Sequence, residues 1–409
     1  MDIDTIRFSH ILEADTLERM EYFLSHTAFV VSHKSESIET LQGVLWYLPI
    51  SSPIIIVTNC PREELGDLRR GLKEQMTSHK KLYLVHQKDR RVARLLRARG
   101  VSQILDVDGR VRDGKGEGMY IGTLCAAMLG YPRWVIFYDA DNIVPCSLLE
   151  YTLAMGKLFL AASAQDLLWE ETPGDALHNV RICWAAKPEV KNGTLEFKLL
   201  GRCTSVISPL FSSLLAEWFG IHDYPIISSN AGEQGMTMKT AKTLRFSSHY
   251  SVETFQFLDF LSHAGSAHRS RKAILQQYQS KSPHFHTKGD DEHIRRMIAQ
   301  SLGSFFVFHE YIPTSTREQL LRICDEMQLE VCYPVIYPSI DDLNLEEEDE
   351  PVYASPFDDG DEQGEAVAID EVDELTENGE SSPYLAFSKR TFVDQYKLFR
   401  EYTPQVLPA

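Results

Sequence analysis

The sequence predicts an α/β protein with a mostly parallel central sheet and helices on both of its faces. Short runs rich in β-branched and aromatic residues, each of strand length, alternate with amphipathic stretches of helical period. Strands that alternate with helices form parallel sheets, because each crossover helix packs against a face of the sheet. Such sheets bind ligands at the carboxyl ends of their strands, so the loops that follow the strands are the first places to look for a site.

Four strands and four helices are predicted in the first third of the chain. The strands are Thr27–Val31, Pro53–Val57, Lys81–Val85 and Trp134–Tyr138. The helices are Ile38–Tyr47, Glu63–Gln75, Arg90–Ala98 and Glu117–Leu129. The four loops that matter most therefore follow Val31, Val57, Val85 and Tyr138.

The middle of the chain changes character. Val180–Ala186 and Leu195–Leu200 flank a turn that contains Asn192-Gly193, which indicates a β-hairpin or two adjacent strands. Asp290 or Asp291 can cap a helix that follows it. Further helices are predicted at Leu210–Phe219, Glu233–Ala241, Val252–Ser262 and Arg317–Gln328.

The negative charge of the chain is concentrated in one segment. The 409 residues include 59 acidic and 41 basic ones, a net charge of -18, which argues against a nucleic acid or an anionic membrane as the partner. Residues 341–382 hold 18 acidic residues and no Lys or Arg, so the remainder has 41 of each sign. Such a segment cannot bury enough apolar surface to fold, so we expect 341–382 to be disordered and its deletion to leave catalysis largely intact.

Cysteine usage and hydropathy indicate a soluble, cytoplasmic protein. The seven cysteines show no CxxC spacing, which favours reduced thiols over a disulfide framework or a zinc site. The first residues show no basic region followed by an apolar stretch. No apolar run approaches the roughly 20 residues that a membrane span needs.

The strongest sign of chemistry is Asp139-Ala140-Asp141-Asn142, which directly follows a predicted strand. Two carboxylates this close repel one another unless a cation or hydrogen-bond donors lie between them. A divalent ion such as Mg²⁺ or Mn²⁺ meets that need with hard oxygen ligands. The other interpretation is a turn with an aspartate helix cap, but the position after a buried strand favours the metal.

A glycine-rich stretch, Asp113-Gly114-Lys115-Gly116-Glu117-Gly118, opens the next predicted helix. Glycines let the backbone approach a ligand, the helix start offers N–H groups, and Lys115 adds a positive charge. These features suit a diphosphate, although the stretch is neither a Walker A sequence nor GxGxxG. A flexible capping loop is the alternative.

Three further loops carry candidate groups. His284 and His286 alternate in an extended segment, where one of them can complete a coordination begun by Asp141, or both can lie in a solvated loop. Gly201-Arg202-Cys203-Thr204 offers an anion site for phosphate or carboxylate, or an ordinary strand–loop–helix turn. Glu233 and Glu253 each stand at a predicted helix start, where capping is the common explanation.

Taken together, these stretches resemble mannosyl-3-phosphoglycerate synthases. The matching stretches, in family order across roughly residues 27–340, are VVSHKSE, HQKD, GKGEGM, DADN, VRICW, GRCTS, NAGE, YSVE and PHFHTKGDDEHI. The resemblance implies a Rossmann-like GT-A glycosyltransferase that transfers mannose from GDP-mannose to the 2-hydroxyl of 3-phosphoglycerate with retention and releases GDP. The product is the phosphorylated precursor of mannosylglycerate, a compatible solute.

The resemblance also implies roles for individual residues. Glu36, Asn59, Lys115 and Asp139 would line the donor site. Asp141 and a histidine, His286 in preference to His284, would bind Mg²⁺, Mn²⁺ or Co²⁺. Arg202, Cys203 through its backbone, and Thr204 would hold the acceptor, with Glu253 facing the acceptor or the mannose. The residues expected to carry the catalysis are Asp141, Glu253 and Lys115.

The parts of the chain follow from the same resemblance. We expect an N-terminal extension (1–26), a nucleotide-sugar-binding part (27–175), an acceptor-binding and metal-completing part (176–340), the acidic disordered segment (341–382) and a C-terminal segment (383–409). The partners would be GDP-mannose and 3-phosphoglycerate, with no nucleic acid and no membrane, and a homodimer is left open.

Other functions share some of these features. A glucosyl-3-phosphoglycerate synthase has the same elements but uses another sugar nucleotide. A sugar-1-phosphate nucleotidyltransferase would need a glycine-rich signature near the N-terminus, which is absent. A regulatory module that binds a sugar nucleotide would not need the metal and anion residues together. Because no residue is an obvious nucleophile, we favour attack on the sugar from the face of the leaving group over a double displacement.

Overall fold

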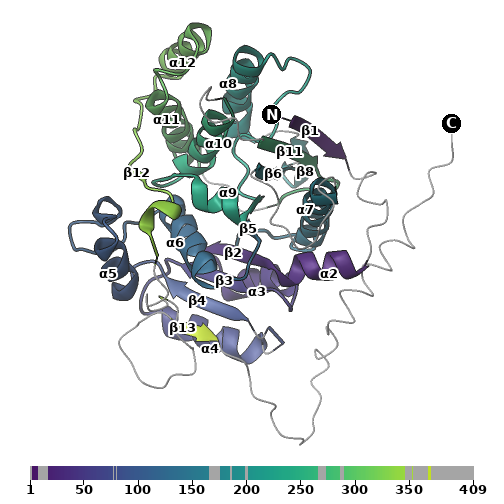
Figure 1. Cartoon of the computed structure of the whole chain (residues 1–409), viewed down its shortest axis with the longest axis vertical. Coiled ribbons are helices and arrows are strands. Elements are labelled where there is room, and N and C mark those ends of the chain that lie inside the picture. The colour runs from purple at the N-terminus through teal and green to yellow at the C-terminus, as the bar shows by residue number, and fades with distance from the viewer. Residues whose placement is uncertain are drawn as a thin grey trace, which may run out of the picture.

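The computed structural model describes residues 2–7, 17–76, 78–79, 81–164, 176–184, 187–198, 201–265, 273–285, 290–345, 352 and 367–369. A nine-stranded sheet forms the centre, in the order β1-β11-β6-β9-β5-β2-β3-β4-β13 (Figure 1). Its strands are β1 (Asp2–Arg7), β2 (Thr27–His33), β3 (Ile54–Thr58), β4 (Leu82–His86), β5 (Trp134–Asp139), β6 (Leu177–Cys183), β9 (Gln234–Thr237), β11 (Ala273–Gln279) and β13 (Val367–Ile369).

The sheet is mostly parallel, as predicted. Parallel pairs join β1 to β11, β11 to β6, β5 to β2, β2 to β3 and β3 to β4. Strand β9 runs antiparallel to both of its neighbours, β5 and β6, and β13 runs antiparallel to β4 at one edge. Two small antiparallel sheets pair β7 (Lys187–Lys191) with β8 (Thr194–Lys198) and β10 (Phe246–Ser247) with β12 (Ile336–Tyr337).

Helices cover both faces of the sheet. One face packs against α2 (Leu17–Ser25), α3 (Ile38–Trp46), α4 (Leu65–Gln75) and α7 (Ser147–Ala164). The other packs against α5 (Arg90–Ala98), α6 (Lys115–Met128), α8 (Arg202–Phe219), α9 (Met238–Thr243), α10 (Ser251–Gly265), α11 (Asp291–Val307) and α12 (Thr314–Met327). Two short 3-10 helices span Ser102–Ile104 and Asp341–Leu343.

The strands feed two hydrophobic cores because successive side chains point to opposite faces. In β2, Phe29 and Val31 belong to one core and Ala28 and Val30 to the other. A strand covered on both faces has few positions that suit a polar side chain, which is why the first four predicted strands are nearly continuous apolar runs. All four are confirmed, as are the helices between them.

One predicted helix, Glu233–Ala241, is wrong in its first half. Residues Gln234–Thr237 form β9, and a helix begins only at Met238. The four strand residues are buried, and their backbone groups pair with β5 on one side and β6 on the other. Pairing with two distant strands outweighs the local helical pattern.

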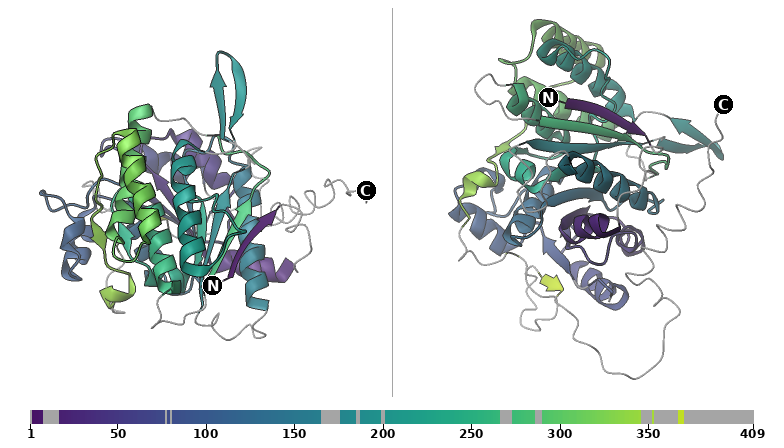
Figure 2. Two further views of the ribbon diagram at one scale, coloured as in Figure 1. Left: turned by 90° about the horizontal axis from the view of Figure 1, so that it is seen from above. Right: turned by 45° about the vertical axis from the view of Figure 1, so that its right-hand side comes forward.

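The structure also differs from the predicted boundaries of the N-terminal extension and of the β-hairpin. The N-terminal extension belongs partly to the body, because β1 pairs with β11 and Phe23 of α2 is fully buried. The hairpin is made by β7 and β8 around Asn192 and Gly193, at φ 50° and 77°, as a turn with two left-handed residues requires. It projects from the body, whereas residues 177–183 join the central sheet as β6 (Figure 2).

The boundary of the predicted disordered segment, residue 341, is set too early. Lys242 pairs with Asp341 at 3.1 Å, Ser339 donates to Asp342, and Leu343 is buried, so these contacts order residues 341–343. Residues 367–369 form the edge strand β13. Apart from Val352 and residues 367–369, residues 346–382 lie outside the described part of the chain, and so does the whole C-terminal segment 383–409.

Two expectations about the class of protein can be compared with the structure. No disulfide joins any of the seven cysteines, all of which are described, as the sequence predicted. Among the described helices, none has the length and apolar character needed to cross a bilayer.

Candidate functional site

The predicted site residues gather at the carboxyl edge of the sheet. Strands β5, β2 and β3 are neighbouring and parallel, so the loops after Asp139, His33 and Thr58 leave the same edge. Helices α6 and α10 begin at this edge with Lys115 and Ser251. This arrangement follows from the parallel connections alone.

Lys115 is the centre of the site. Its Nζ donates to Asp139 Oδ2 and to Glu253 Oε1, both at 2.7 Å. The three side chains are 12%, 28% and 4% exposed, so the two ion pairs are largely shielded from water. Lys115 is the first residue of α6, where the helix dipole disfavours a cation, and the two carboxylates offset that cost.

The electrostatics of this cluster are strongly coupled. Burial alone would lower the pKa of Lys115, but the charges and hydrogen bonds of Asp139 and Glu253 outweigh it and raise that pKa well above its ordinary value. Burial is also the largest cause of the raised pKa of Asp139, and the charges of Asp141 and Glu253 raise it further against the effect of Lys115. The lysine is therefore a permanent cation between acidic groups.

Gly232 leaves the space that the ion pair fills. A Cβ atom at this position would lie 2.4 Å from Asp139 Oδ2 and 2.8 Å from Lys115 Nζ. Both distances are shorter than real Cβ atoms show, so a side chain at this position would force the backbone and the charged ends of Asp139 and Lys115 apart. The loop before β9 is thus part of the site, which the capping interpretation of Glu233 did not predict.

The donor residues predicted from the resemblance lie in loops that are held by hydrogen bonds, either within one loop or between neighbouring loops. Glu36 Oε2 accepts hydrogen bonds from the backbone N–H groups of Lys34 and Ser35, which closes a tight loop after β2. Asn59 Nδ2 donates to Asp113 Oδ1 at 2.9 Å. The same oxygen of Asp113 pairs with Lys88 at 2.9 Å, so the loops after β3, after β4 and after the 3-10 helix Ser102–Ile104 are joined beside the start of α6.

The predicted metal residues are described in part. Asp141 follows β5, and the backbone N–H of Ile143 donates to Phe285 O at 2.7 Å, which holds the histidine-containing segment beside the aspartate loop. His284 is buried, stacks on Trp184, and its Nδ1 lies 3.5 Å from Glu233 Oε1. His286 lies outside the described residues, and within them no three His, Cys, Asp or Glu side chains are grouped to hold a metal.

The contacts of His284 are those of a structural residue, because it packs between an indole ring and a buried carboxylate. Glu233 therefore contacts a histidine where a helix cap was predicted.

The predicted acceptor residues form the first turn of α8. Arg202 is the first helical residue, and Cys203 and Thr204, both buried, follow it. The first backbone N–H groups of a helix have no partners within it, so this turn can accept an anion. Arg202 also pairs with Asp291, whose side chain is 94% exposed, at the start of α11.

A chain of polar contacts connects the α8 turn with the lysine cluster. Cys203 Sγ lies 3.8 Å from Ser301 Oγ, and Asn230 donates from Nδ2 both to Ser301 and to Thr254. Thr254 directly follows Glu253, the partner of Lys115. Buried polar contacts therefore link the first turn of α8 to the residue that follows Glu253.

The sequence did not single out two buried residues that build the site. Arg181 of β6 donates to the carbonyls of Ser228 and Ser229 and to Gln234 Oε1, and it approaches the carbonyl of Glu253 at 3.4 Å. Glu150 of α7 accepts the backbone N–H groups of residues 281 and 282 and fixes the start of the histidine segment. The available signal was a charged residue inside an apolar run, as in Val180-Arg181-Ile182.

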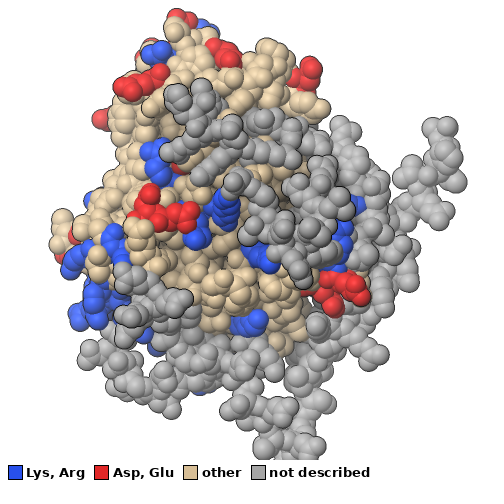
Figure 3. Space-filling model, in the orientation of Figure 1, with Lys and Arg blue, Asp and Glu red and all other residues tan. Residues whose placement is uncertain are grey.

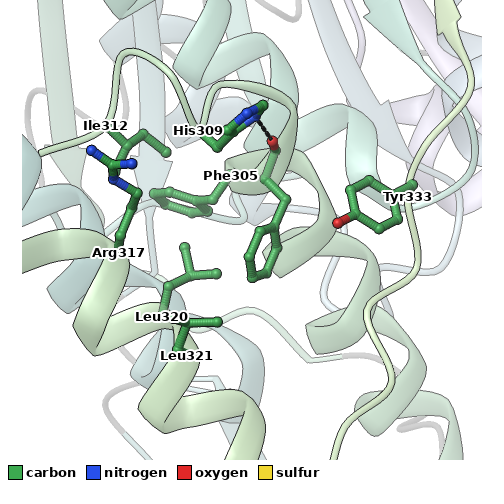
Figure 4. A pocket seen from close by; sticks show the side chains of 8 residues that line it. Phe305, His309, Ile312, Arg317, Leu320, Leu321 and Tyr333 are labelled. Atoms are coloured by element: carbon green, nitrogen blue, oxygen red, sulfur yellow. Dashed lines mark hydrogen bonds between the residues drawn. The ribbon is translucent and has the colours of Figure 1, made fainter. Parts of the chain in front are cut away.

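A cavity elsewhere in the molecule is not part of this site. It has a volume of about 320 Å³, lies between α11 and α12, and contains none of the predicted site residues (Figure 4). It is lined by Phe305, Phe306, His309, Ile312, Arg317, Leu320, Leu321 and Tyr333.

Comparisons with known proteins agree on one family. Residues 5–351 match the family model described as mannosyl-3-phosphoglycerate synthase. The mannosyl-3-phosphoglycerate synthase of Pyrococcus furiosus is 33% identical over 303 residues, which cover 71% of this chain and 73% of that protein. That of Aeropyrum pernix is 29% identical over 316 residues, covering 74% and 76%.

Solved structures are also similar. The crystal structure of glucosyl-3-phosphoglycerate synthase from Mycobacterium tuberculosis in complex with Mn²⁺ and UDP-glucose has a TM-score of 0.46 and 18% identity. The match covers 76% of this chain and 88% of that one.

The fit of Gly232 against the ion pair can be tested by substitution. Gly232→Ala forces the backbone away from Asp139 and Lys115, and we expect it to lower the free energy of unfolding by about 1–3 kcal/mol, as overpacking does. Gly66→Ala is the matched control. Gly66 lies in helix α4, and a Cβ at this position would meet no atom within 4 Å, so the substitution should not lower the stability. Equal stability of the Gly232 variant and the wild-type chain in denaturant unfolding would contradict this geometry.

Proposed function

Because the chain belongs to the mannosyl-3-phosphoglycerate synthase family, we propose that it transfers mannose from GDP-mannose to the 2-hydroxyl of 3-phosphoglycerate. The observation that supports this most strongly is the lysine cluster at the carboxyl edge of a parallel sheet, joined by polar contacts to a helix N-terminus that suits an anion. The family implies a GT-A fold, transfer with retention, and a cytoplasmic enzyme. A donor site and an acceptor site are needed side by side, and the same edge offers both.

The donor would occupy the loops after β2, β3 and β5. We propose that the Glu36 loop and Asn59 face the nucleoside and that Lys115 and Asp139 lie beside the diphosphate. Lys115 would offset the charge that develops on the leaving GDP. Since its amine is fixed by two carboxylates before the donor binds, it needs no reorganisation when the sugar–phosphate bond breaks.

A divalent cation fits the charges of this site. Among the described residues of this site, Asp139, Asp141 and Glu253 supply three carboxylates, and Lys115 and the buried Arg181 supply two cations, so the site keeps a negative charge that a divalent ion would offset. Oxygen ligands suit Mg²⁺ or Mn²⁺. We propose that Asp141 and His286 hold the ion, which when bound would stabilise the negative charge of the diphosphate.

The acceptor carries a phosphate and a carboxylate, so it needs two anion sites. We propose that the first turn of α8 binds one of them through Arg202, Thr204 and the backbone N–H of Cys203. Orientation of the 2-hydroxyl next to the anomeric carbon would supply much of the rate enhancement. Glu253 would face the acceptor from the first turn of α10, where one of its oxygens accepts a hydrogen bond from Lys115.

Retention at the anomeric carbon places a condition on these residues. A double displacement requires a carboxylate nucleophile that is free to attack. Both carboxylates of the cluster are bonded to Lys115, which lowers their nucleophilicity. We therefore favour attack by the acceptor hydroxyl from the face that GDP leaves, with Lys115 and Glu253 positioning the two substrates.

The proposed reaction is tested directly by product analysis. The protein incubated with GDP-mannose, 3-phosphoglycerate and Mg²⁺ should yield GDP and a product with the mass of mannosyl-3-phosphoglycerate. UDP-glucose, offered in parallel, separates this activity from glucosyl-3-phosphoglycerate synthesis. No transfer product at any pH or with any metal would contradict the proposal, and transfer from UDP-glucose alone would correct the donor.

The metal site makes a separate prediction. Asp141→Asn should weaken binding of Mn²⁺, followed by electron paramagnetic resonance in the presence of GDP, by more than about tenfold, because a carboxylate ligand is lost. Asp108→Asn, at an exposed turn, is the matched control and should bind Mn²⁺ normally. Unchanged Mn²⁺ affinity in the Asp141 variant would show that this carboxylate is not a ligand.

A further inference from the structure

Helix α5 carries a concentration of positive charge that lies away from the lysine cluster. We define the α5 basic patch by the arginines that surround the outer face of this helix, namely Arg62, Arg90, Arg94, Arg97 and Arg110. The inner face of α5 buries Val92, Ala93 and Leu96, so its arginines point outward. Figure 3 shows basic side chains gathered over this helix.

The arginines of the patch repel one another. The pKa of Arg110 is lowered, first by desolvation and then by the charges of Arg62 and Arg90. The nearby carboxylates that form ion pairs in the described part of the chain, Asp89 and Asp113, pair with Arg91 and Lys88. A patch of like charges with this little compensation favours an anionic partner.

The residues that flank the acidic run 346–366 are both fixed to the body of the molecule. At one end, the carbonyl of Asn344 accepts a hydrogen bond at 3.1 Å from Arg99, which directly follows the last residue of α5. At the other end, Val367 pairs with Leu84 of β4, the strand that precedes α5 in the sequence. The run therefore starts beside the end of α5 and is attached at its other end to an edge strand of the sheet.

The composition and length of the run match the patch. Residues 346–366 contain ten acidic residues and no Lys or Arg. A random coil of this length would span roughly 25 Å, whereas the nine residues of α5 extend over about 14 Å. Val352, the seventh residue of the run, is buried in the large hydrophobic core that also contains Val92 and Leu96. Attachment at both ends gives the run a high effective concentration at the patch.

We propose that the acidic run 346–366 binds along the α5 basic patch and neutralises it. Its ten carboxylates would compete with other polyanions for the α5 basic patch. The surface of the protein continues from this patch through Lys88 and Asp113 to the loop of Asn59. The charge excess of the chain then acts locally, as an internal counterion for one helix. This inference depends on charge and chain placement and is independent of the reaction proposed above.

A peptide with the sequence of residues 346–366 tests the interaction. Its binding is measured by fluorescence anisotropy to a full-length variant in which a Gly-Ser linker of equal length replaces these residues. We expect saturable binding at about 0.05 M salt that weakens at least about tenfold at 0.5 M, because salt screens the charges. The unaltered chain, whose own run occupies the patch, should bind the peptide at least about tenfold more weakly.

Two arginine variants of the linker protein locate the binding surface. Arg90→Gln, Arg94→Gln and Arg97→Gln together should weaken peptide binding at least about tenfold. The matched control changes three exposed arginines of α11 and α12, Arg296→Gln, Arg317→Gln and Arg322→Gln, and should leave binding unchanged. Circular dichroism establishes that both variants are folded.

Three results would overturn the proposal. They are no binding to the linker protein, equal binding to the two arginine variants, and equal binding to the unaltered chain. Loss of GDP binding in the α5 variant, with peptide binding unchanged, would assign the patch to the nucleotide instead.

Discussion

The buried amine of Lys115 is the interaction on which the site depends. It joins the start of α6 to the end of β5 and to the first turn of α10, three segments that are far apart in the sequence. Each carboxylate alone would be costly to bury, and the lysine alone would oppose the dipole of its own helix. Together they form a charged centre around which Gly232, Arg181 and the α8 turn are arranged.

The surroundings of this centre hold it by backbone contacts. Arg181 binds the carbonyls of the loop before β9 and approaches the carbonyl of Glu253, so that loop and α10 keep one relative position. Glu117 accepts from Tyr337 and from the backbone N–H of His249, which ties the start of α6 to the segment before α10. Charges held in fixed positions in this way are preorganised to stabilise the anionic leaving group of the proposed transfer.

The sequence predicted those features of the fold that depend on the local residue pattern and on the order of the strands. Buried parallel strands appear as apolar runs, and motifs that follow them must meet at one edge, so Asp139 was placed at that edge without coordinates. Asn59 was named only from the family resemblance. Strand β9 was missed because its pairing with β5 and β6 is non-local. Gly232 and Arg181 were missed because their importance lies in close approach to distant groups, which no spacing in the sequence reveals.

The most direct test of this account is a double-mutant cycle on the free energy of unfolding. Lys115→Met leaves Asp139 and Glu253 facing each other without a cation and should destabilise the chain strongly, by about 3–5 kcal/mol. Adding Glu253→Gln removes one of the two charges and should recover part of that loss, a coupling of roughly 1–3 kcal/mol. Strictly additive effects of the two substitutions would contradict the central role of the lysine.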